Sequence, residues 1–514
     1  MKNIHALLLC AISLHLRAQF TNVMISNQGS PSEVAIQINF KKPNEVVAGA
    51  NIDKSYYSAN GGQTWTIGTV TSSYGVVGDP SFTCDTSGNL YFFHLASGFK
   101  KILCQKSTNG GQTWSNGIVT AQNGVKAQDK EWAVVDWAPN SSYKNTLYTV
   151  WAELDNYSSS LPQDSSIIKL SKSTDGGITL SNAVRVSKQA ANCGFNAQKG
   201  ACPAVGPNGE VYVSWCGLWG IRFQKSLDGG NTWLPQDVQV DINNPTWYFT
   251  VPGITWGNAF TSMVCDISGG PNTGNLYISW ADKRNGTTNT DVFVARSTNG
   301  GNTWNTIRVN NDATTSHQFH PFIACDPITG YVYVVFYDRR NYPNNNGTDV
   351  YLAWSTDGGN SWSNVPISAN TFSGNVSYDY NCISAYNNEI RPVWTANFGV
   401  QSVWTALINY SQLGPTGVQA SAITPSLVEL QNYPNPFSVY AVINFYIPKD
   451  EKVSLKVYDM IGSEVANLVD GETRAQGWHQ MSLNTSDYNL SSGIYYFSIH
   501  TPSGSQTTKV FLVK

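Results

Sequence analysis

Charged residues are scarce in this sequence of 514 residues. It contains 34 acidic and 31 basic side chains, which make up 13% of the chain, whereas an average soluble protein has about 25%. The composition therefore excludes helical proteins rich in Ala, Glu and Lys. The formal net charge is -3, and binding to a phosphate backbone needs clustered Lys and Arg. We therefore expect no nucleic-acid partner.

Long apolar stretches are also missing, with one short exception at the N-terminus. Residues 1–18 combine Lys2, an apolar centre and Ala18 before Gln19, a pattern typical of a cleaved secretory signal peptide. No later stretch approaches the roughly 20 apolar residues of a membrane helix. The sequence thus predicts an exported protein that is not an integral membrane protein.

Cysteine is uncommon, and its positions indicate two different roles. In an oxidising compartment, Cys193 and Cys202 form the favoured disulfide pair, because both lie in one Gly- and Asn-rich stretch. Cys84, Cys265 and Cys325 each end an apolar run before an Asp, and we expect them to be buried core residues. The sequence indicates no cofactor and leaves a structural calcium ion open.

One motif, Ser-x-Asn/Asp-Gly-Gly-x-Thr/Ser-Trp, occurs six times, once with Leu in place of Trp. Its copies start 49 to 71 residues apart, a spacing typical of repeated supersecondary units. The Asn or Asp oxygen can accept hydrogen bonds from the turn backbone, and the glycines allow positive φ. We therefore expect a structural role, as hairpin turns, for Asn60, Asn109, Asp175, Asp228, Asn299 and Asp357.

The motif resembles the Asp box, or BNR repeat, of the sialidase-like β-propellers. This resemblance implies that each box joins the third and fourth strands of a blade, on the face away from the active site. Pairs of apolar strands occur near residues 33–50, 80–95, 131–152, 201–216, 261–281, 320–337 and 381–397. We therefore predict an all-β fold with a seven-bladed propeller over residues 19–412, in which Phe20 to Ser26 complete the last blade.

Residues 413–424 are a predicted linker, and residues 425–514 change in character. Their alternating strands and frequent turns predict a small Ig-like β-sandwich. The YPNPF sequence at 433–437 and the ending at 509–514 resemble the type A sorting domain of type IX secretion cargo from Bacteroidetes. The resemblance implies recognition by the outer-membrane secretion machinery and a final location at the cell surface or outside the cell.

Loops on the face opposite the boxes should converge on the central channel, where propellers bind ligands. Carboxylates such as Asp79, Glu131 and Asp379 could there act as acid and base in glycoside hydrolysis. The full set of candidate catalytic residues is Asp79, Glu131, His317, His320, Asp379 and Tyr380. The candidate substrate-binding residues are Asp129, Lys130, Arg284, Arg339 and Trp247.

Arginine positions bear on which sugar is recognised. The sialidase resemblance implies three arginines that clasp the carboxylate of an acid sugar, the first of them ahead of the first box. No Arg occurs between Arg17 and Arg185, so this clamp is incomplete. Asp282 with Arg284 and Asp338 with Arg339 and Arg340 occupy parallel positions in adjacent blades, which favours structural Asp–Arg pairs.

Three other hypotheses remain open at this point. A uronate polysaccharide lyase would use His317 or His320 with Tyr380, and Arg339 would neutralise the uronate. His317 and His320 could also bind a metal ion with a nearby carboxylate. A non-catalytic adhesin would bind glycans through exposed aromatic rings, such as those of residues 247–249. In each case we expect an exported propeller that recognises an extracellular glycan.

Overall fold

The computed structural model describes residues 20–194, 196–217, 219–242, 247–373, 379–413, 428–433 and 435–513. The chain divides into two compact units, residues 1–416 and 417–514. The predicted signal peptide and all but the first residue of the predicted linker lie outside the described residues.

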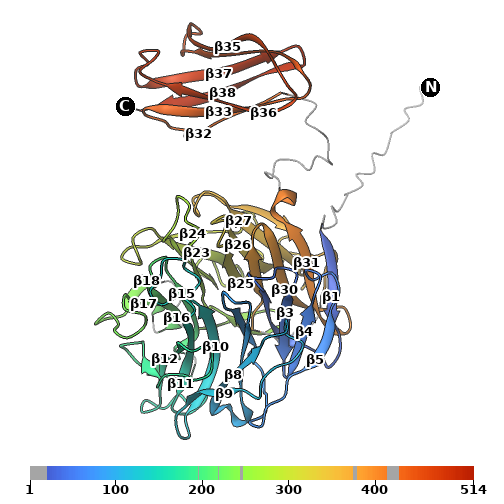
Figure 1. Ribbon diagram of the computed structural model, residues 1–514, viewed down its shortest axis with the longest axis vertical. Helices are drawn as coiled ribbons and strands as arrows, with labels where there is room; N and C mark the ends of the chain where they lie inside the picture. Colours follow the sequence, from blue (N-terminus) through green and yellow to red (C-terminus); the bar gives the residue numbers. More distant parts are fainter. Residues whose placement is uncertain are drawn as a thin grey trace, which may run out of the picture. The chain divides into compact units, whose positions relative to one another are not determined.

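In the described part of the first unit, seven antiparallel sheets form the blades of a propeller (Figure 1). Its first three blades are β2 (Ser32–Ile38), β3 (Val46–Asn51), β4 (Lys54–Ser58) and β5 (Thr66–Thr69); β6 (Ser81–Cys84), β7 (Leu90–Leu95), β8 (Lys101–Ser107) and β9 (Ile118–Gln122); and β10 (Ala127–Val135), β11 (Leu147–Leu154), β12 (Ser165–Ser173), β13 (Val184–Arg185) and β14 (Ala191–Asn192). The next three are β15 (Lys199–Val205), β16 (Val211–Gly217), β17 (Gly220–Ser226) and β18 (Val238–Asp241); β21 (Ser262–Cys265), β22 (Leu276–Asp282), β23 (Asp291–Ser297) and β24 (Asn305–Arg308); and β25 (Gln318–Cys325), β26 (Val332–Asp338), β27 (Asp349–Ser355) and β28 (Ser363–Pro366).

The seventh blade joins the two ends of the propeller chain. It contains β29 (Cys382–Tyr386), β30 (Glu389–Asn397), β31 (Gln401–Asn409) and, as its fourth strand, β1 (Thr21–Ser26). β1 pairs antiparallel with β31, and the two lie side by side in Figure 1. The predicted closure by the N-terminal strand is confirmed, and it leaves no open edge between the first and last parts of the ring.

The propeller unit also contains short elements outside the blades. These are the hairpin of β19 (Tyr248–Val251) and β20 (Ile254–Asn258), and the 3-10 turns η1 (Ser97–Phe99) and η2 (Tyr410–Gln412). The hairpin lies between the fourth and fifth blades in the sequence and forms a sheet of its own.

The second strands of the blades are rich in apolar residues because both of their faces are buried. Every residue of β7, β11, β16, β22 and β26 is buried. Four tryptophans on second strands, Trp151, Trp215, Trp280 and Trp394, are among the largest fully buried side chains. Such rings bury about 150–250 Å² each, so they dominate the packing between neighbouring blades.

The six boxes form the turns that the sequence predicts, each between the third and fourth strands of its blade. In the first box, Ser58 Oγ accepts from the Gly62 N–H at 2.9 Å, and Asn60 Oδ1 accepts from the Thr64 N–H at 3.0 Å. The same bonds recur in the other boxes. Because first and third strands of a blade run in the same direction, the boxes lie at the opposite end from the starts of the first strands.

Asp228 offers a direct test of the box. Its carboxylate accepts from Ser226, Thr232 and backbone N–H groups, and these bonds lower its pKa to about 2 although burial acts against them. Asp228→Ala should lower the free energy of unfolding by about 1–2 kcal/mol, measured by urea denaturation at pH 7. Asp228→Asn should cost less, because Asn60, Asn109 and Asn299 fill this position in other boxes.

The pH dependence provides the control for this prediction. A depressed pKa gives a stabilisation that is present above the unfolded value near 4 and is lost as pH falls toward 2. The difference between the wild type and Asp228→Asn should therefore shrink over that range. A difference that does not change with pH would contradict a role for the ionised carboxylate.

The second unit consists of two sheets that enclose one apolar core, as in the predicted sandwich. One sheet has the order β32-β33-β36, and the other has the order β35-β34-β37-β38. The strands are β32 (Glu429–Tyr433), β33 (Tyr440–Ile447), β34 (Glu451–Tyr458), β35 (Glu464–Arg474), β36 (Gly477–Asn484), β37 (Gly493–Thr501) and β38 (Gly504–Leu512). Leu455, Phe445 and Phe497 lie at the centre of the core and are fully buried.

The predicted Cys193–Cys202 disulfide is wrong, since both cysteines are free. Cys193 follows β14 in the third blade, and its Sγ contacts the Ser165 carbonyl at 3.1 Å. Cys202 lies on the innermost strand of the fourth blade, where its Sγ accepts from the Met263 N–H at 3.3 Å. The Cys193 side chain thus contacts its own blade, whereas the Cys202 side chain contacts the fifth blade. Cys84, Cys265 and Cys325 are free and lie in the core as predicted, Cys325 less completely buried than the other two.

Candidate functional site

A cavity of about 740 Å³ opens among the starts of the first strands and the loops between second and third strands. Its position is therefore at the end of the blades opposite the boxes. Four carboxylic acids line it, Glu33, Asp79, Asp129 and Asp379, together with Lys130 and Lys199. Five of these six side chains come from the start of an inner strand or the residues just before it, in the first four blades of the chain, and Asp379 precedes the inner strand of the seventh.

A repeated backbone feature directs these side chains toward the channel. Glu33, Asp79, Lys130 and His320 all have φ between 50° and 53°, and Gly200 occupies the equivalent place in the fourth blade with φ 62°. In four of these blades the pairing of first and second strands shifts register at this point. Such bulges re-aim a side chain, and left-handed non-glycine residues often mark functional sites.

Asp79 is held by a set of hydrogen-bond donors. Asn51 links it to Glu33: Asn51 Oδ1 accepts from the Asp79 N–H at 2.8 Å, and Asn51 Nδ2 donates to Glu33 Oε2 at 2.6 Å. The Asp79 carboxylate accepts from the Lys130 N–H at 3.3 Å and from the Tyr380 hydroxyl at 3.5 Å. A side chain at Gly78 would collide with Asn51, so glycine is required there.

Three carboxyl groups of the cavity hold a proton more tightly than a free carboxyl group does. Burial, and then Asp79, raise the pKa of Asp379 to about 7, and Lys130 and Lys199 only partly oppose this effect. Burial, Asp79 and Asp379 raise the pKa of Glu33 well above its usual range. Burial and Asp129 also raise the pKa of Asp79, but a hydrogen bond from Glu33 and the proximity of Lys130 act in the opposite direction.

The two lysines of the cavity are already engaged. Lys199 Nζ lies 2.7 Å from Asp129 Oδ2 and rests between the rings of Tyr157 and Trp247, at 4.6 and 4.8 Å from their centroids. Burial alone would lower the pKa of Lys199, but Asp129 raises it. Lys130 Nζ sits 3.4 Å from the centroid of the Tyr380 ring. Both cations are therefore neutralised or covered by the protein itself.

Glu131 and Tyr380 lie outside the wall of this cavity. Glu131 is fully buried, and burial together with Asp79 raises its pKa well above the usual range. Tyr380 is 4% exposed and packs edge-on against Trp132, which in turn contacts Phe322. Because Glu131 is fully buried and does not line the cavity, it cannot contact a ligand there directly. Tyr380 acts on the site through its hydrogen bond to Asp79.

The two histidines are not brought together as a pair. His317 Nδ1 lies 2.8 Å from Thr290 Oγ1, and burial with Lys283 and Arg339 lowers its pKa to about 4. His320 is buried, its Nε2 donates to the Trp256 carbonyl at 2.8 Å, and burial lowers its pKa to about 4. Neither histidine lines the cavity. Within the described residues, no group of three His, Cys, Asp or Glu side chains is arranged to hold a metal ion.

The arginines named from the sequence form structural contacts. Arg284 Nε donates to Asp282 at 2.9 Å, and its guanidinium also reaches Asp241 at 3.1 Å. Arg339 is 3% exposed and donates to Thr348 Oγ1 at 3.0 Å and to the Pro252 carbonyl at 2.7 Å. Neither arginine is among the residues that line the cavity.

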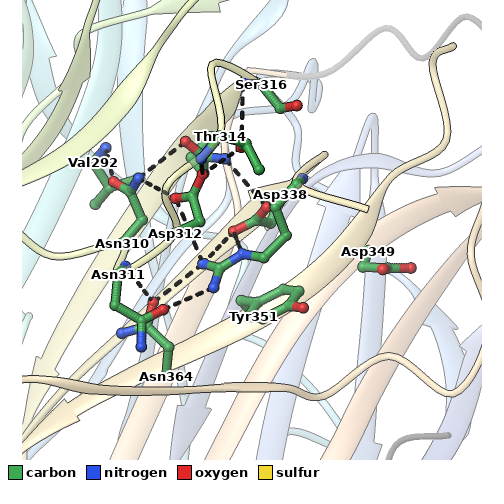
Figure 2. A network of polar contacts seen from close by, with 12 residues as sticks. Val292, Asn310, Asn311, Asp312, Thr314, Ser316, Asp338, Asp349, Tyr351 and Asn364 are labelled. Carbon is green, nitrogen blue, oxygen red and sulfur yellow. Dashed lines mark hydrogen bonds and ion pairs between the residues drawn. The ribbon is translucent and has the colours of Figure 1, made fainter. Parts of the chain in front are cut away.

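The second Asp–Arg pair lies within a wider polar network. Arg340 Nε donates to Asp338 Oδ2 at 2.8 Å, and its other nitrogens donate to Asn311 and Asn364. Figure 2 shows Asn311, Asn364 and Asp312 gathered beside Asp338. The network ties the fifth blade to the sixth, which agrees with the structural interpretation of the repeated Asp–Arg segments.

Aromatic rings complete the cavity wall, although not in the form anticipated for residues 247–249. Trp247 and Phe249 are each 8% exposed, so these residues do not form an exposed cluster. Trp247 lines the cavity from inside and donates through Nε1 to the Gly194 carbonyl at 3.1 Å. The exposed rings at the cavity are instead Phe99, Tyr157 and Trp256.

Five of the eleven predicted catalytic and substrate-binding residues thus line the cavity, namely Asp79, Asp379, Asp129, Lys130 and Trp247. Sequence reasoning missed Glu33, Lys199, Asn51 and Tyr157. Glu33 and Lys199 lie at the starts of the first strands of the first and fourth blades. A search for charged residues at the start of every first strand would therefore find them. Asn51 ends the second strand of the first blade, Tyr157 lies in the loop between β11 and β12, and neither carries a comparable signal.

Comparisons with known proteins bear on the C-terminal unit and on the propeller separately. Residues 431–514 match the family described as "Secretion system C-terminal sorting domain". This domain marks the protein for the type IX secretion route to the cell surface or extracellular space, as the sequence predicted. No curated protein matches significantly. In the described part of the chain, no helix is both long and apolar enough to span a bilayer.

Several solved structures resemble the chain distantly. A sialidase of Trypanosoma rangeli in complex with the inhibitor DANA is 13% identical and has a TM-score of 0.42, with 87% of this chain and 85% of that chain covered. The alpha-L-arabinofuranosidase ARB93A of Fusarium graminearum is 12% identical, with a TM-score of 0.43 and coverages of 77% and 99%. YCF48 bound to D1 peptide is 11% identical, with a TM-score of 0.42 and coverages of 78% and 97%. Similarities this distant do not assign a function.

Proposed function

We propose that the protein is an exported glycoside hydrolase that uses the carboxyl groups of the cavity as acid and base. The observation that carries this proposal is a cavity in which neighbouring carboxyl groups raise one another's pKa, with Asp79 acting on both Glu33 and Asp379. Like charges held together in one buried site are not all ionised at once, so one acid keeps its proton while another is ionised. Environments that separate the pKa values of neighbouring acids are a general means of assigning acid and base roles.

Asp379 is the proton donor in this mechanism. Its pKa of about 7 leaves it largely protonated up to neutral pH, and Oδ1 is buried with no hydrogen-bond partner among the described residues. A proton held in this way is available to a leaving group. Asn258 fixes the backbone at this point, because its Nδ2 donates to the Asp379 carbonyl at 2.7 Å.

Asp79 is the base. Burial and then Asp129 raise its pKa overall, while Lys130 and a hydrogen bond from Glu33 act in the opposite direction. The Lys130 N–H and the Tyr380 hydroxyl donate to its carboxylate. Hydrogen bonds to the charged form favour that form, and we assign the ionised role to Asp79 on this ground. Asp379 protonates the glycosidic oxygen as the bond from that oxygen to the anomeric carbon breaks. A water molecule adds to the anomeric carbon and gives its proton to Asp79, so that atoms and charge balance.

The proposal is tested by incubating the purified protein with arabinan, xylan, galactan, β-glucan, sialyllactose and polygalacturonate. New reducing ends without unsaturated uronates are the expected result. Binding without turnover on the whole panel would favour a non-catalytic adhesin. Unsaturated uronate products would favour a lyase, although Arg339 and His317 contact other protein groups and are not assembled around the cavity.

A further inference from the structure

Two exposed aromatic rings form a platform at the rim of the cavity. Phe99 ends η1 between β7 and β8, and Tyr157 lies in the loop between β11 and β12. Their side chains are 47% and 49% exposed, yet both line the cavity. The ring centroids are 6.4 Å apart and the ring planes are inclined by only 29°. The two rings therefore place exposed aromatic surface together at the rim, and sugar rings pack against surface of this kind.

A third ring comes from the hairpin of β19 and β20. Trp256 is 41% exposed and lines the same cavity. The hairpin is fixed to the sixth blade, because His320 donates to the Trp256 carbonyl and Arg339 donates to the Pro252 carbonyl. Trp256 also packs beside Trp247, with centroids 6.2 Å apart. The ring is therefore held in place before any ligand arrives, which lowers the entropic cost of binding.

The charges of the cavity disfavour an acidic sugar. No arginine is among its lining residues within the described chain, whereas Glu33, Asp79, Asp129 and Asp379 all are. The Lys199 ammonium is 2.7 Å from Asp129, and the Lys130 ammonium lies over the Tyr380 ring. A ligand carboxylate would have to compete with Asp129 for Lys199 and would face the remaining acids.

We infer that the ligand is an uncharged oligosaccharide of at least two units, with one unit at the carboxyl cluster and another stacked on the Phe99–Tyr157 platform. This inference rests on the proposed function, because it assigns the reacting unit to Asp379 and Asp79. A cavity of about 740 Å³ lies in the upper part of the usual range for ligand sites, about 300–1,000 Å³, and leaves room beyond a single sugar ring.

The test measures binding by calorimetry in the Asp379→Asn background, so that it does not depend on turnover. The probes are xylohexaose, arabinohexaose, cellohexaose and galactohexaose, the matching methyl monoglycosides, and hexagalacturonate. At least one neutral hexasaccharide should bind at least tenfold more tightly than hexagalacturonate. Replacing both platform rings, Phe99→Ala with Tyr157→Ala, should weaken that hexasaccharide at least tenfold and leave the methyl glycoside within twofold.

Phe398→Ala is the matched control, because Phe398 is similarly exposed at 45% but does not line the cavity. It should leave hexasaccharide binding unchanged. Unchanged binding in the platform variant, tighter binding of hexagalacturonate, or no binding of any neutral hexasaccharide would each overturn the inference. Failure of the proposed hydrolysis would show separately, as tight binding of a hexasaccharide that the wild-type protein does not cleave.

Discussion

Replacing Asp379 with Asn should lower kcat for glycan hydrolysis by about 10²–10⁴-fold, the usual contribution of a general acid. The amide has nearly the same shape but carries no proton that it can transfer to a leaving group. In the wild type, activity should fall as pH rises through about 7, because the pKa of Asp379 lies there and only the protonated form is active. Initial rates of reducing-end release across the pH range measure both effects.

The stability of this variant separates catalysis from folding. The pKa of Asp379 is higher in the native state than in the unfolded state, where it is near 4. Above pH 4, the ionisable carboxyl group therefore lowers the free energy of unfolding. At pH 7, the melting temperature of Asp379→Asn should therefore be equal to or higher than that of the wild type. Asp155→Asn is the matched control, since Asp155 pairs with Lys126 outside the cavity, and it should retain full activity. Wild-type activity in Asp379→Asn would refute the acid role.

Replacing Arg284 with Met should lower the free energy of unfolding by about 3–5 kcal/mol, as expected when one partner of a buried ion pair is removed. Asp282 is fully buried and receives hydrogen bonds from Arg284 and from Trp280 Nε1. Methionine would leave its carboxylate with two donors, the indole N–H and the backbone N–H of residue 284, and with no cation of its own pair. Urea denaturation at pH 7 measures the loss.

Arg308→Met provides the comparison for this prediction. The Arg308 side chain is 37% exposed and contacts Asp291 at 3.3 Å, so its removal should cost less than about 1 kcal/mol. If Arg284 instead held substrate, Arg284→Met would raise KM and leave the denaturation midpoint unchanged. That outcome would contradict the structural assignment of the Asp282–Arg284 pair.

Much of the propeller could be predicted because its repeated turns carry a strong local signal. Each box combines a hydroxyl, an Asn or Asp and two glycines. These residues form the turn through contacts with one another, so the turn does not depend on distant parts of the chain. The closure by β1 also followed from counting strands, since a seventh blade without a box lacks one edge. The Cys193–Cys202 prediction failed because closeness in sequence does not show which blade each side chain contacts.

The site was harder to predict because its geometry depends on the backbone more than on residue type. Asp79 and Asp379 were found from their places before inner strands. The left-handed residues at Glu33, Asp79 and Lys130, which aim these side chains inward, have no sequence signature. Glu131 follows Lys130 directly, yet the bulge buries it beside the channel and leaves its neighbour at the cavity. Arg339 likewise turned toward the β19–β20 hairpin, a partner 87 residues away.

The protonation of Asp379 in the free protein tests the central claim most directly. Carbon-13 labelling of Asp carboxyl groups, with Asp379→Asn used to assign the signal, would follow its titration by NMR without any ligand. The account predicts a midpoint near pH 7, far above the ordinary value of about 4. A midpoint near 4 would mean that Asp379 is ionised at neutral pH and cannot donate a proton, and the proposed mechanism would be wrong.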